Sequence, residues 1–296
     1  MKVSVSIVSF NTREMLKSCL MDILGQSYKD IEVWVVDNCS SDNSAEMVER
    51  RFSQVHLVRS GENGGFAKGH NQSLRMIRGD LTLILNPDTK LPKDAVAKMV
   101  EFFRQNPNCG VAGCKIVGFD NRLQPNGGDL PFGLSLISWL FNLEMLPFVG
   151  RLLPNFHRMD KEYYSRSREV GWVGGTFMMV RSRVFKKAGL LNENYFMYFE
   201  DVDFCYKVQR ADFKVMLNPE VVIQHASGAS SKDPKLAQFR GEMVGLKKFY
   251  KQHFGLPAAL IIKLLIYLSL AARILAFAAV GKVSLARVYL KTIVSI

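Results

Sequence analysis

The stretch Ile31-Glu-Val-Trp-Val-Val-Asp37-Asn38 predicts a strand over residues 31–36 that stops at two polar side chains. Its β-branched and aromatic residues favour a buried strand. The segment Val3-Ser-Val-Ser-Ile-Val-Ser9 is a second short β-branched run and predicts the strand before it. Both expected strands therefore end at polar residues.

Strands and helices alternate regularly over residues 1–116. Further strands are expected over 55–58, 81–85 and 110–116, and helices over 13–25, 42–51, 66–78 and 92–105. This alternation predicts an α/β fold with a doubly wound, mostly parallel, Rossmann-like sheet. In such sheets ligands bind at the carboxyl ends of the strands.

The residues that follow these strands are polar or expose backbone. They are Ser9 and Asn11 after the first strand, Asp37 after the second, Asn63 and Gly65 after the third, and Asn86 and Asp88 after the fourth. A carboxylate at Asp37 can accept from ribose hydroxyls or a base N–H, and one at Asp88 can hold a divalent cation that bridges two phosphates. A turn or helix cap explains either residue taken alone. The evidence for a site is their convergence.

The second half of the chain adds two candidate groups. The cluster Glu200-Asp-Val-Asp203 follows an aromatic run, and one of its carboxylates could act as a general base, although an acidic first turn of a helix explains the cluster too. His225 ends the second of two short strands expected within 213–225. It could ligate a metal, although a lone histidine is more often structural.

Charge and motifs exclude several protein classes. Residues 232–296 carry 11 basic and 2 acidic side chains, whereas residues 1–231 carry 28 and 25. The nearly neutral body argues against a nucleic-acid-binding protein. The first turn lacks the glycines of a dinucleotide-binding fold, and no P-loop occurs. Five scattered cysteines indicate a reducing compartment and no zinc ribbon.

The basic C-terminal segment is also apolar. Lys263 and Arg273 interrupt the apolar run 256–280, and only nine uninterrupted residues lie between them. We expect one or two helices that lie in the membrane interface, with the basic side chains reaching the headgroups. A pair of core or dimer helices and a single membrane span are the alternatives. No signal-peptide pattern opens the chain. We expect the protein to lie at the cytoplasmic face of the membrane.

Over about residues 2–230 these segments together resemble the inverting glycosyltransferases of family 2, which have the GT-A fold. The resemblance is carried by Val5–Asn11, Val35–Asp42, Asn63–Ala67 with Asn71, Asn86-Pro-Asp88 in place of an Asp-x-Asp metal motif, and Glu200-Asp201 in place of the catalytic Glu-Asp pair. The run Tyr198-Phe-Glu-Asp-Val-Asp-Phe204 is most similar to the rhamnosyltransferase-like subgroup.

The resemblance implies a role for each matching residue. Asp88, with His225, is expected to coordinate Mg²⁺ or Mn²⁺ on the donor diphosphate, and Asp37 is expected to hold the nucleoside. Asp201 is expected to deprotonate the acceptor hydroxyl, with Glu200 as the fallback. Asn86 replaces the first carboxylate of the metal motif, which makes metal dependence less strict.

The domain organisation follows from the same resemblance. Residues 1–230 form the glycosyltransferase domain, with a nucleotide-binding half over 1–116 and an acceptor-binding half over 117–230. Residues 231–296 form a helical tail, of which 256–296 meets the membrane surface.

The expected reaction is transfer of a deoxysugar, such as rhamnose from dTDP-rhamnose, to a lipid-linked (polyprenyl diphosphate) or cell-surface polysaccharide acceptor. The alternatives are a UDP-hexose donor and an inactive membrane-bound scaffold. The sequence leaves the oligomeric state open.

Overall fold

The computed structural model describes residues 1–146, 152–226, 234–279, 281, 286, 289–290 and 292–293. The chain forms two compact units, each made of two segments. The sheet unit comprises Met1–Gly128 and Arg158–Ser230, and the helical unit comprises Asp129–His157 and Ser231–Ile296. Residues 129–157 group with the tail, whereas they were expected to belong to the acceptor-binding half over 117–230. Part of the expected membrane segment lies outside the described residues, namely 280, 282–285, 287–288, 291 and 294–296.

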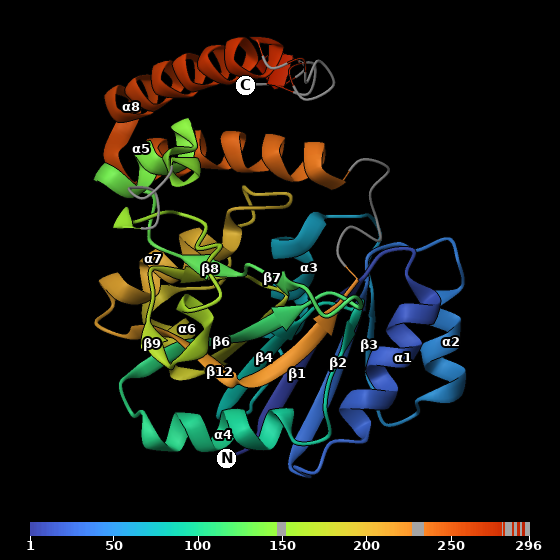
Figure 1. Cartoon of the computed structure of the whole chain (residues 1–296). Coiled ribbons are helices and arrows are strands. Elements are labelled where there is room, and N and C mark those ends of the chain that lie inside the picture. Colours follow the sequence, from blue (N-terminus) through green and yellow to red (C-terminus); the bar gives the residue numbers. More distant parts are fainter. Residues whose placement is uncertain are drawn as a thin grey trace. The chain divides into compact units, whose positions relative to one another are not determined.

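Among the described residues of the sheet unit, ten strands form one mixed sheet in the order β3-β2-β1-β4-β11-β6-β12-β5, with β7 on β6 and β9 on β12 (Figure 1). The strands β8 and β10 pair separately. The strands are β1 Val3–Ser9, β2 Ile31–Asp37, β3 His56–Arg59, β4 Leu81–Leu85, β5 Thr89–Lys90, β6 Cys109–Val117, β7 Leu123–Gln124, β8 Gly127–Gly128, β9 Arg168–Glu169, β10 Trp172–Val173, β11 Phe177–Arg181 and β12 Lys214–His225.

The first four strands are parallel, as the sequence predicts. Their register brings the carboxyl ends to one level. Ser9 lies opposite Asp37, and Ile7 lies opposite Leu85, so the segment after β4 begins level with the last residues of β1. This register places the polar residues after β1, β2 and β4 along one edge of the sheet.

The sequence prediction is wrong in two details of the second half of the sheet. β11 inserts antiparallel between β4 and β6, so β6 is not the next parallel strand. Residues 214–225 form one strand, β12, rather than two, with an irregularity between Asn218 and Val222 that keeps both halves paired with β6. Both features depend on partners that are far away in sequence.

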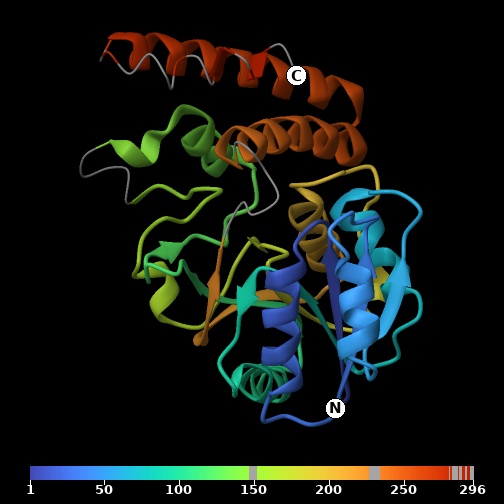
Figure 2. The same ribbon diagram turned by 90° about the vertical axis from the view of Figure 1, so that its right-hand side faces the viewer.

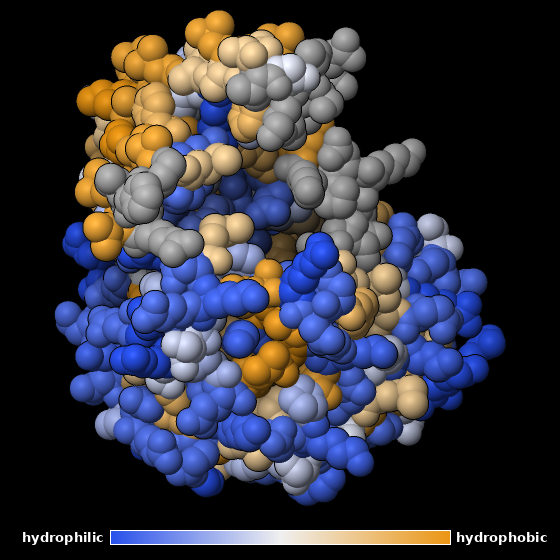
Figure 3. Space-filling model, in the orientation of Figure 1, coloured by the Kyte–Doolittle hydropathy of each residue, from blue (hydrophilic) through white to orange (hydrophobic). Residues whose placement is uncertain are grey.

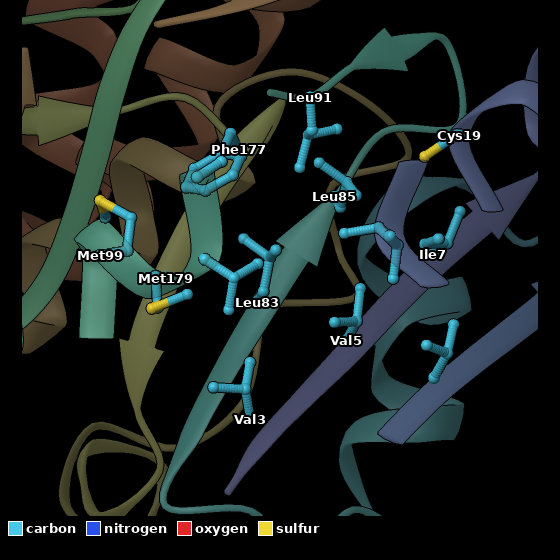
Figure 4. Close-up of a cluster of buried hydrophobic side chains, with 14 of the residues drawn as sticks. Val3, Val5, Ile7, Cys19, Leu83, Leu85, Leu91, Met99, Phe177 and Met179 are labelled. Atoms are coloured by element: carbon cyan, nitrogen blue, oxygen red, sulfur yellow. The ribbon is translucent and has the colours of Figure 1, made fainter. Parts of the chain in front are cut away.

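Apolar faces of helices cover the sheet. The helices of this unit are α1 Arg13–Leu24, α2 Ser44–Arg51, α3 Gly65–Leu74, α4 Ala95–Gln105, α6 Arg183–Ala188 and α7 Glu200–Arg210, with a 3-10 turn at Tyr163–Ser165. On α4 the buried positions, among them Val96, Met99 and Phe103, recur every three or four residues. Figure 4 shows Met99 and Cys19 in the cluster of side chains from β1, β4 and β11.

The helical unit consists of α5 (Gly133–Phe141), a 3-10 turn (Leu143–Met145) and α8 (Pro234–Ala279) (Figure 2). The helix α8 is broken at Gly255, whose φ of 85° suits only glycine without strain, and Pro257 follows. Tyr250 donates to the carbonyl of Pro131 (2.7 Å), which ties α8 to the start of α5.

Arg273 does not reach outward, contrary to expectation. It is 8% exposed and donates to the carbonyls of Leu140 (3.0 Å) and Trp139 (2.6 Å) at the end of α5. Its guanidinium also lies over the rings of Phe239 and Tyr289. The last carbonyls of a helix lack partners within that helix, and this buried cation supplies donors to them.

The second half of α8, residues 256–279, carries only apolar side chains on its exposed face. The large ones are Leu256, Leu260, Ile261, Leu264, Leu268 and Leu275, each more than half exposed. Figure 3 shows hydrophobic residues gathered over this part of α8. Among the described residues, one helix (Leu236–Ala279) is long and apolar enough to cross a membrane.

Candidate active site

Two buried oxygen atoms at the end of β2 have no hydrogen-bond partner among the described residues. They are Oδ1 of Asp37 and Oδ1 of Asn38. The other oxygen of Asp37 accepts from the backbone N–H of Ser40 (3.0 Å), which fixes the carboxylate. Buried acceptors without donors are costly, so this pair can accept from the N–H or O–H groups of a ligand. Asn38 was not among the predicted site residues, although its place directly after Asp37 could have indicated it.

The turn after β1 is fixed by its own side chains. Ser9 is fully buried, and its hydroxyl lies 2.9 Å from that of Thr12. Asn11 is exposed in a left-handed conformation (φ 53°), and its Oδ1 accepts from the N–H of Ser41 (2.8 Å). Ser9 therefore shapes this edge, whereas Asn11 connects it to the loop after β2.

The start of α3 faces the same edge. Oδ1 of Asn63 accepts from the N–H of Gly65 (3.1 Å) and lies 3.3 Å from Nδ2 of Asn38. Gly65 has φ +80°, and a Cβ there would lie 2.1 Å from the carbonyl oxygen of Phe196. Only glycine fits this close approach, which joins α3 to the loop before α7.

Asn71 has a different environment from the one expected. It is 1% exposed, and its Nδ2 donates to the carbonyl of Leu191 (2.8 Å) and to Glu193 (2.8 Å). Its Oδ1 accepts from the N–H of Leu191 (3.2 Å). Because the amide is used in full within the protein, Asn71 leaves the candidate ligand-binding set and instead anchors the 191–193 segment.

The structure brings Asp88 and His225 together from segments 137 positions apart (225 − 88). Oδ1 of the buried Asp88 lies 3.2 Å from Nε2 of His225, and Nδ2 of Asn86 lies 3.5 Å from the same nitrogen. Among the described residues no group of three His, Cys, Asp or Glu side chains could hold a metal. One carboxylate and one imidazole fit a divalent cation whose remaining ligands come from diphosphate oxygens and water.

Burial separates the acidic residues in the first turn of α7. Glu200 is 4% exposed and Asp203 is fully buried, whereas Asp201 remains partly exposed. Oδ2 of Asp201 accepts from the N–H of Gly175 (3.1 Å). Burial, followed by the negative charge of Asp201, raises the pKa of Glu200 well above its ordinary value. Asp201 is therefore the carboxylate of this turn that stays open to solvent.

Gly175 connects the two acidic segments. The next residue, Thr176, accepts from the N–H of Asn86 (3.0 Å) through its carbonyl, while Gly175 itself holds Asp201. A Cβ on Gly175 would lie 2.5 Å from the ring of Phe66 at the start of α3. Asp201, the segment of Asp88 and the start of α3 thus meet at one glycine, which was not among the predicted site residues.

The geometry places the predicted groups along one edge. Two strand spacings, each about 4.8 Å, separate β2, which carries Asp37, from β4, which leads to Asp88. Asp37 and Asp88 therefore follow strands that lie about 10 Å apart along this edge.

Comparisons with known proteins point to one family. Residues 4–189 match the family model of glycosyl transferase family 2. A low-salt glycan biosynthesis hexosyltransferase of Haloferax volcanii is 26% identical over 217 residues, which cover 72% of this chain and 63% of that protein. The N-acetylglucosaminyl-diphospho-decaprenol L-rhamnosyltransferase of Mycobacterium tuberculosis is 24% identical over 242 residues, which cover 78% of each chain.

A solved structure has the same fold. The mannosyltransferase of Pyrobaculum calidifontis, in complex with GDP-Man and Mn²⁺, superposes with a TM-score of 0.63 at 17% identity, and the match covers 99% of this chain and 86% of that one. The expected GT-A fold with a C-terminal helical extension is confirmed.

Replacing Glu200 by Gln should stabilise the protein increasingly as pH rises. A carboxyl group whose pKa is raised on folding favours the folded state below its unfolded pKa, about 4.5, and loses that contribution at higher pH. Urea unfolding of wild type and variant between pH 4.5 and 8.5 measures this. Glu193→Gln is the matched control, because hydrogen bonds from Asn71 and Arg75 lower the pKa of Glu193. This variant should lose stability relative to the wild type as pH rises. A Glu200→Gln difference independent of pH contradicts the assignment.

Replacing Gly175 by Ala should disturb both the fold and Asp201. The added methyl group meets the ring of Phe66, which packs against His70 (4.4 Å between ring centres), so we expect a loss of about 1–3 kcal/mol in unfolding free energy. Gly61→Ala is the control, since nothing lies within 4 Å of its Cβ. Thermal unfolding compares the two, and equal midpoints would show that Gly175 has no packing role.

Proposed function

Because this chain belongs to glycosyl transferase family 2, we propose that it transfers a sugar, with inversion, from a nucleoside diphosphate donor to an acceptor hydroxyl. The observation that carries the proposal is the position of Asp201. Of the three acidic side chains in the first turn of α7 it is the one that is not buried, and Gly175 ties it to the segment that leads to Asp88.

Asp201 is the proposed general base. An inverting transfer in one step needs a carboxylate that takes the proton of the attacking hydroxyl, and no nucleophile from the protein. The N–H groups of Gly175 and Val202 donate to the two oxygens of Asp201, which fixes the direction of the carboxylate. Glu200, buried with a raised pKa, is less suited to act as the fallback base than the partly exposed Asp201.

Asp88 and His225 are the proposed metal ligands. A divalent cation there would neutralise the charge that develops on the departing diphosphate. An imidazole beside a carboxylate favours Mn²⁺ over Mg²⁺, which prefers oxygen ligands throughout. Because this proposed set has only two side chains, the cation and the nucleoside diphosphate should bind cooperatively.

The proposed donor site follows the edge formed by β1, β2 and β4. Oδ1 of Asp37 and of Asn38 would accept from the nucleoside. Ser9, Asn11, Asn63 and Gly65 would shape the surrounding backbone, and Asn86 would lie at the diphosphate.

The proposed donor is a deoxysugar nucleotide such as dTDP-rhamnose, and the proposed acceptor is lipid-linked or part of a cell-surface polysaccharide. The subgroup motif supports this, together with the mycobacterial relative, whose name specifies L-rhamnosyl transfer to a decaprenol-linked sugar. A UDP-hexose donor is the alternative, supported by the haloarchaeal relative, which is named a hexosyltransferase. Sugar release from a panel of dTDP-, UDP- and GDP-sugars, with and without Mn²⁺, separates the two.

We also propose that the helical unit binds the cytoplasmic face of the membrane. Every exposed side chain of residues 256–279 is apolar, while Arg273 and Ser269 are turned inward and buried. Lys263 is half-buried, with its Nζ over the ring of Tyr267. This is the arrangement expected of a helix that meets lipid rather than water. The nearby basic residues Lys247, Lys248 and Lys251 suit an anionic surface.

Asp201→Asn should reduce transfer by about a hundredfold to ten-thousandfold, because the amide cannot accept the hydroxyl proton. Binding of the nucleoside diphosphate, measured by calorimetry, should remain. Asp212→Asn, an exposed residue in a turn with φ 64°, is the matched control. Full transfer activity in a folded Asp201→Asn variant would end the assignment of this base.

The double substitution Leu260→Gln and Leu264→Gln should weaken vesicle binding. Each leucine is nearly three-fifths exposed, so losing both should cost about 2 kcal/mol, or roughly thirtyfold in the binding constant. Sedimentation with vesicles containing anionic lipid measures this. Met21→Gln removes a similarly exposed apolar side chain from α1 and should have no effect. Equal binding by all three proteins would exclude this face as the contact.

A further inference from the structure

Gln124 contacts His225 at two points, although nothing in the sequence singled it out. It lies on β7, level with Ile116 of β6, and β12 runs along the other side of β6 to end at His225. Nε2 of Gln124 donates to the backbone carbonyl of His225 (3.0 Å), and Oε1 lies 3.0 Å from the imidazole Nδ1.

These two contacts determine where the imidazole carries its proton. A backbone carbonyl can only accept, so the NH₂ group of Gln124 must face it and Oε1 must face the ring. Oε1 can also only accept, so Nδ1 must carry the hydrogen. In the neutral imidazole the lone pair then lies on Nε2, the nitrogen 3.2 Å from Oδ1 of Asp88.

The opposite tautomer would close the site. With its hydrogen on Nε2, His225 would donate directly to Asp88, and both side chains would be consumed in one hydrogen bond. That arrangement would also leave Oε1 of Gln124 against a bare nitrogen lone pair. Gln124 therefore disfavours the closed state. It leaves the lone pair of Nε2 beside Oδ1 of Asp88, with Nδ2 of Asn86 as its other neighbour at 3.5 Å.

We propose that Gln124 is a positioning residue that makes Nε2 of His225 a metal ligand. The inference rests on the metal site proposed above and adds the device that keeps its two ligands available. A partner that fixes the free nitrogen of a ligating histidine typically changes metal affinity by about 10–100-fold.

The tautomer can be tested without metal or substrate. We expect ¹⁵N NMR of the metal-free protein, at a pH where His225 is neutral and with His225→Ala to assign the signal, to show hydrogen on Nδ1. Gln124→Met, which has similar length and no strong acceptor, should move the hydrogen to Nε2. Gln124→Glu keeps an acceptor and should retain it on Nδ1.

Gln224→Met is the matched control, because Gln224 precedes His225 but contacts Asn121 instead (3.4 Å). Hydrogen on Nε2 in the wild type, or no change in Gln124→Met, overturns the inference. Thermal unfolding shows whether each variant is folded. If Gln124→Met does not fold, Gln124→Glu still tests whether an acceptor at this position keeps the hydrogen on Nδ1.

Metal affinity gives the second readout. Titration of Mn²⁺ followed by electron paramagnetic resonance, with dTDP or UDP present, should show affinity about 10–100-fold weaker in Gln124→Met and unchanged in Gln224→Met. A wild type that has the expected tautomer but binds no Mn²⁺ with either nucleotide overturns the proposed metal site. It also overturns the role of Nε2 of His225 as a metal ligand. Unchanged Mn²⁺ affinity in a Gln124→Met variant whose tautomer has moved overturns the positioning role alone.

Discussion

The shared level at which β1, β2 and β4 end is the constraint on which the site depends. Register pairs Ser9 with Asp37 and Ile7 with Leu85, so the residues after these strands emerge together. A slip of one residue would turn every side chain of a strand to the opposite face. The apolar residues of β1 and β4 in the core prevent such a slip, so core packing indirectly positions the polar groups at the edge (Figure 4).

Gly175 extends this edge to the other half of the sheet unit. Its N–H holds Asp201, its neighbour Thr176 holds Asn86, and its missing side chain admits Phe66. Three segments from distant parts of the chain therefore meet at one junction of hydrogen bonds and packing contacts. A carboxylate held by a backbone N–H at such a junction has a more fixed direction than one on a free side chain.

Burial assigns different tasks to residues of one type. Glu200 and Asp203 are buried beside Asp201, which alone of the three stays accessible, and the raised pKa of Glu200 reflects the burial. In the helical unit a charged side chain is buried and apolar ones are exposed. Arg273 is turned inward to the carbonyls at the end of α5, and leucines are turned outward. An apolar exterior is unfavourable in water and favourable at a lipid surface.

The sequence by itself determined the parallel strands, the helices between them and the polar residues at the strand ends, because periodicity and turn chemistry are local. It also located the acidic turn of α7. Tertiary structure decided the antiparallel insertion of β11, the grouping of residues 129–157 with the tail, and the contact between Gln124 and His225. It also decided that Asn71 and Arg273 point inward. Each of these depends on which distant segment supplies a hydrogen-bond partner, and that choice is made only when the chain packs.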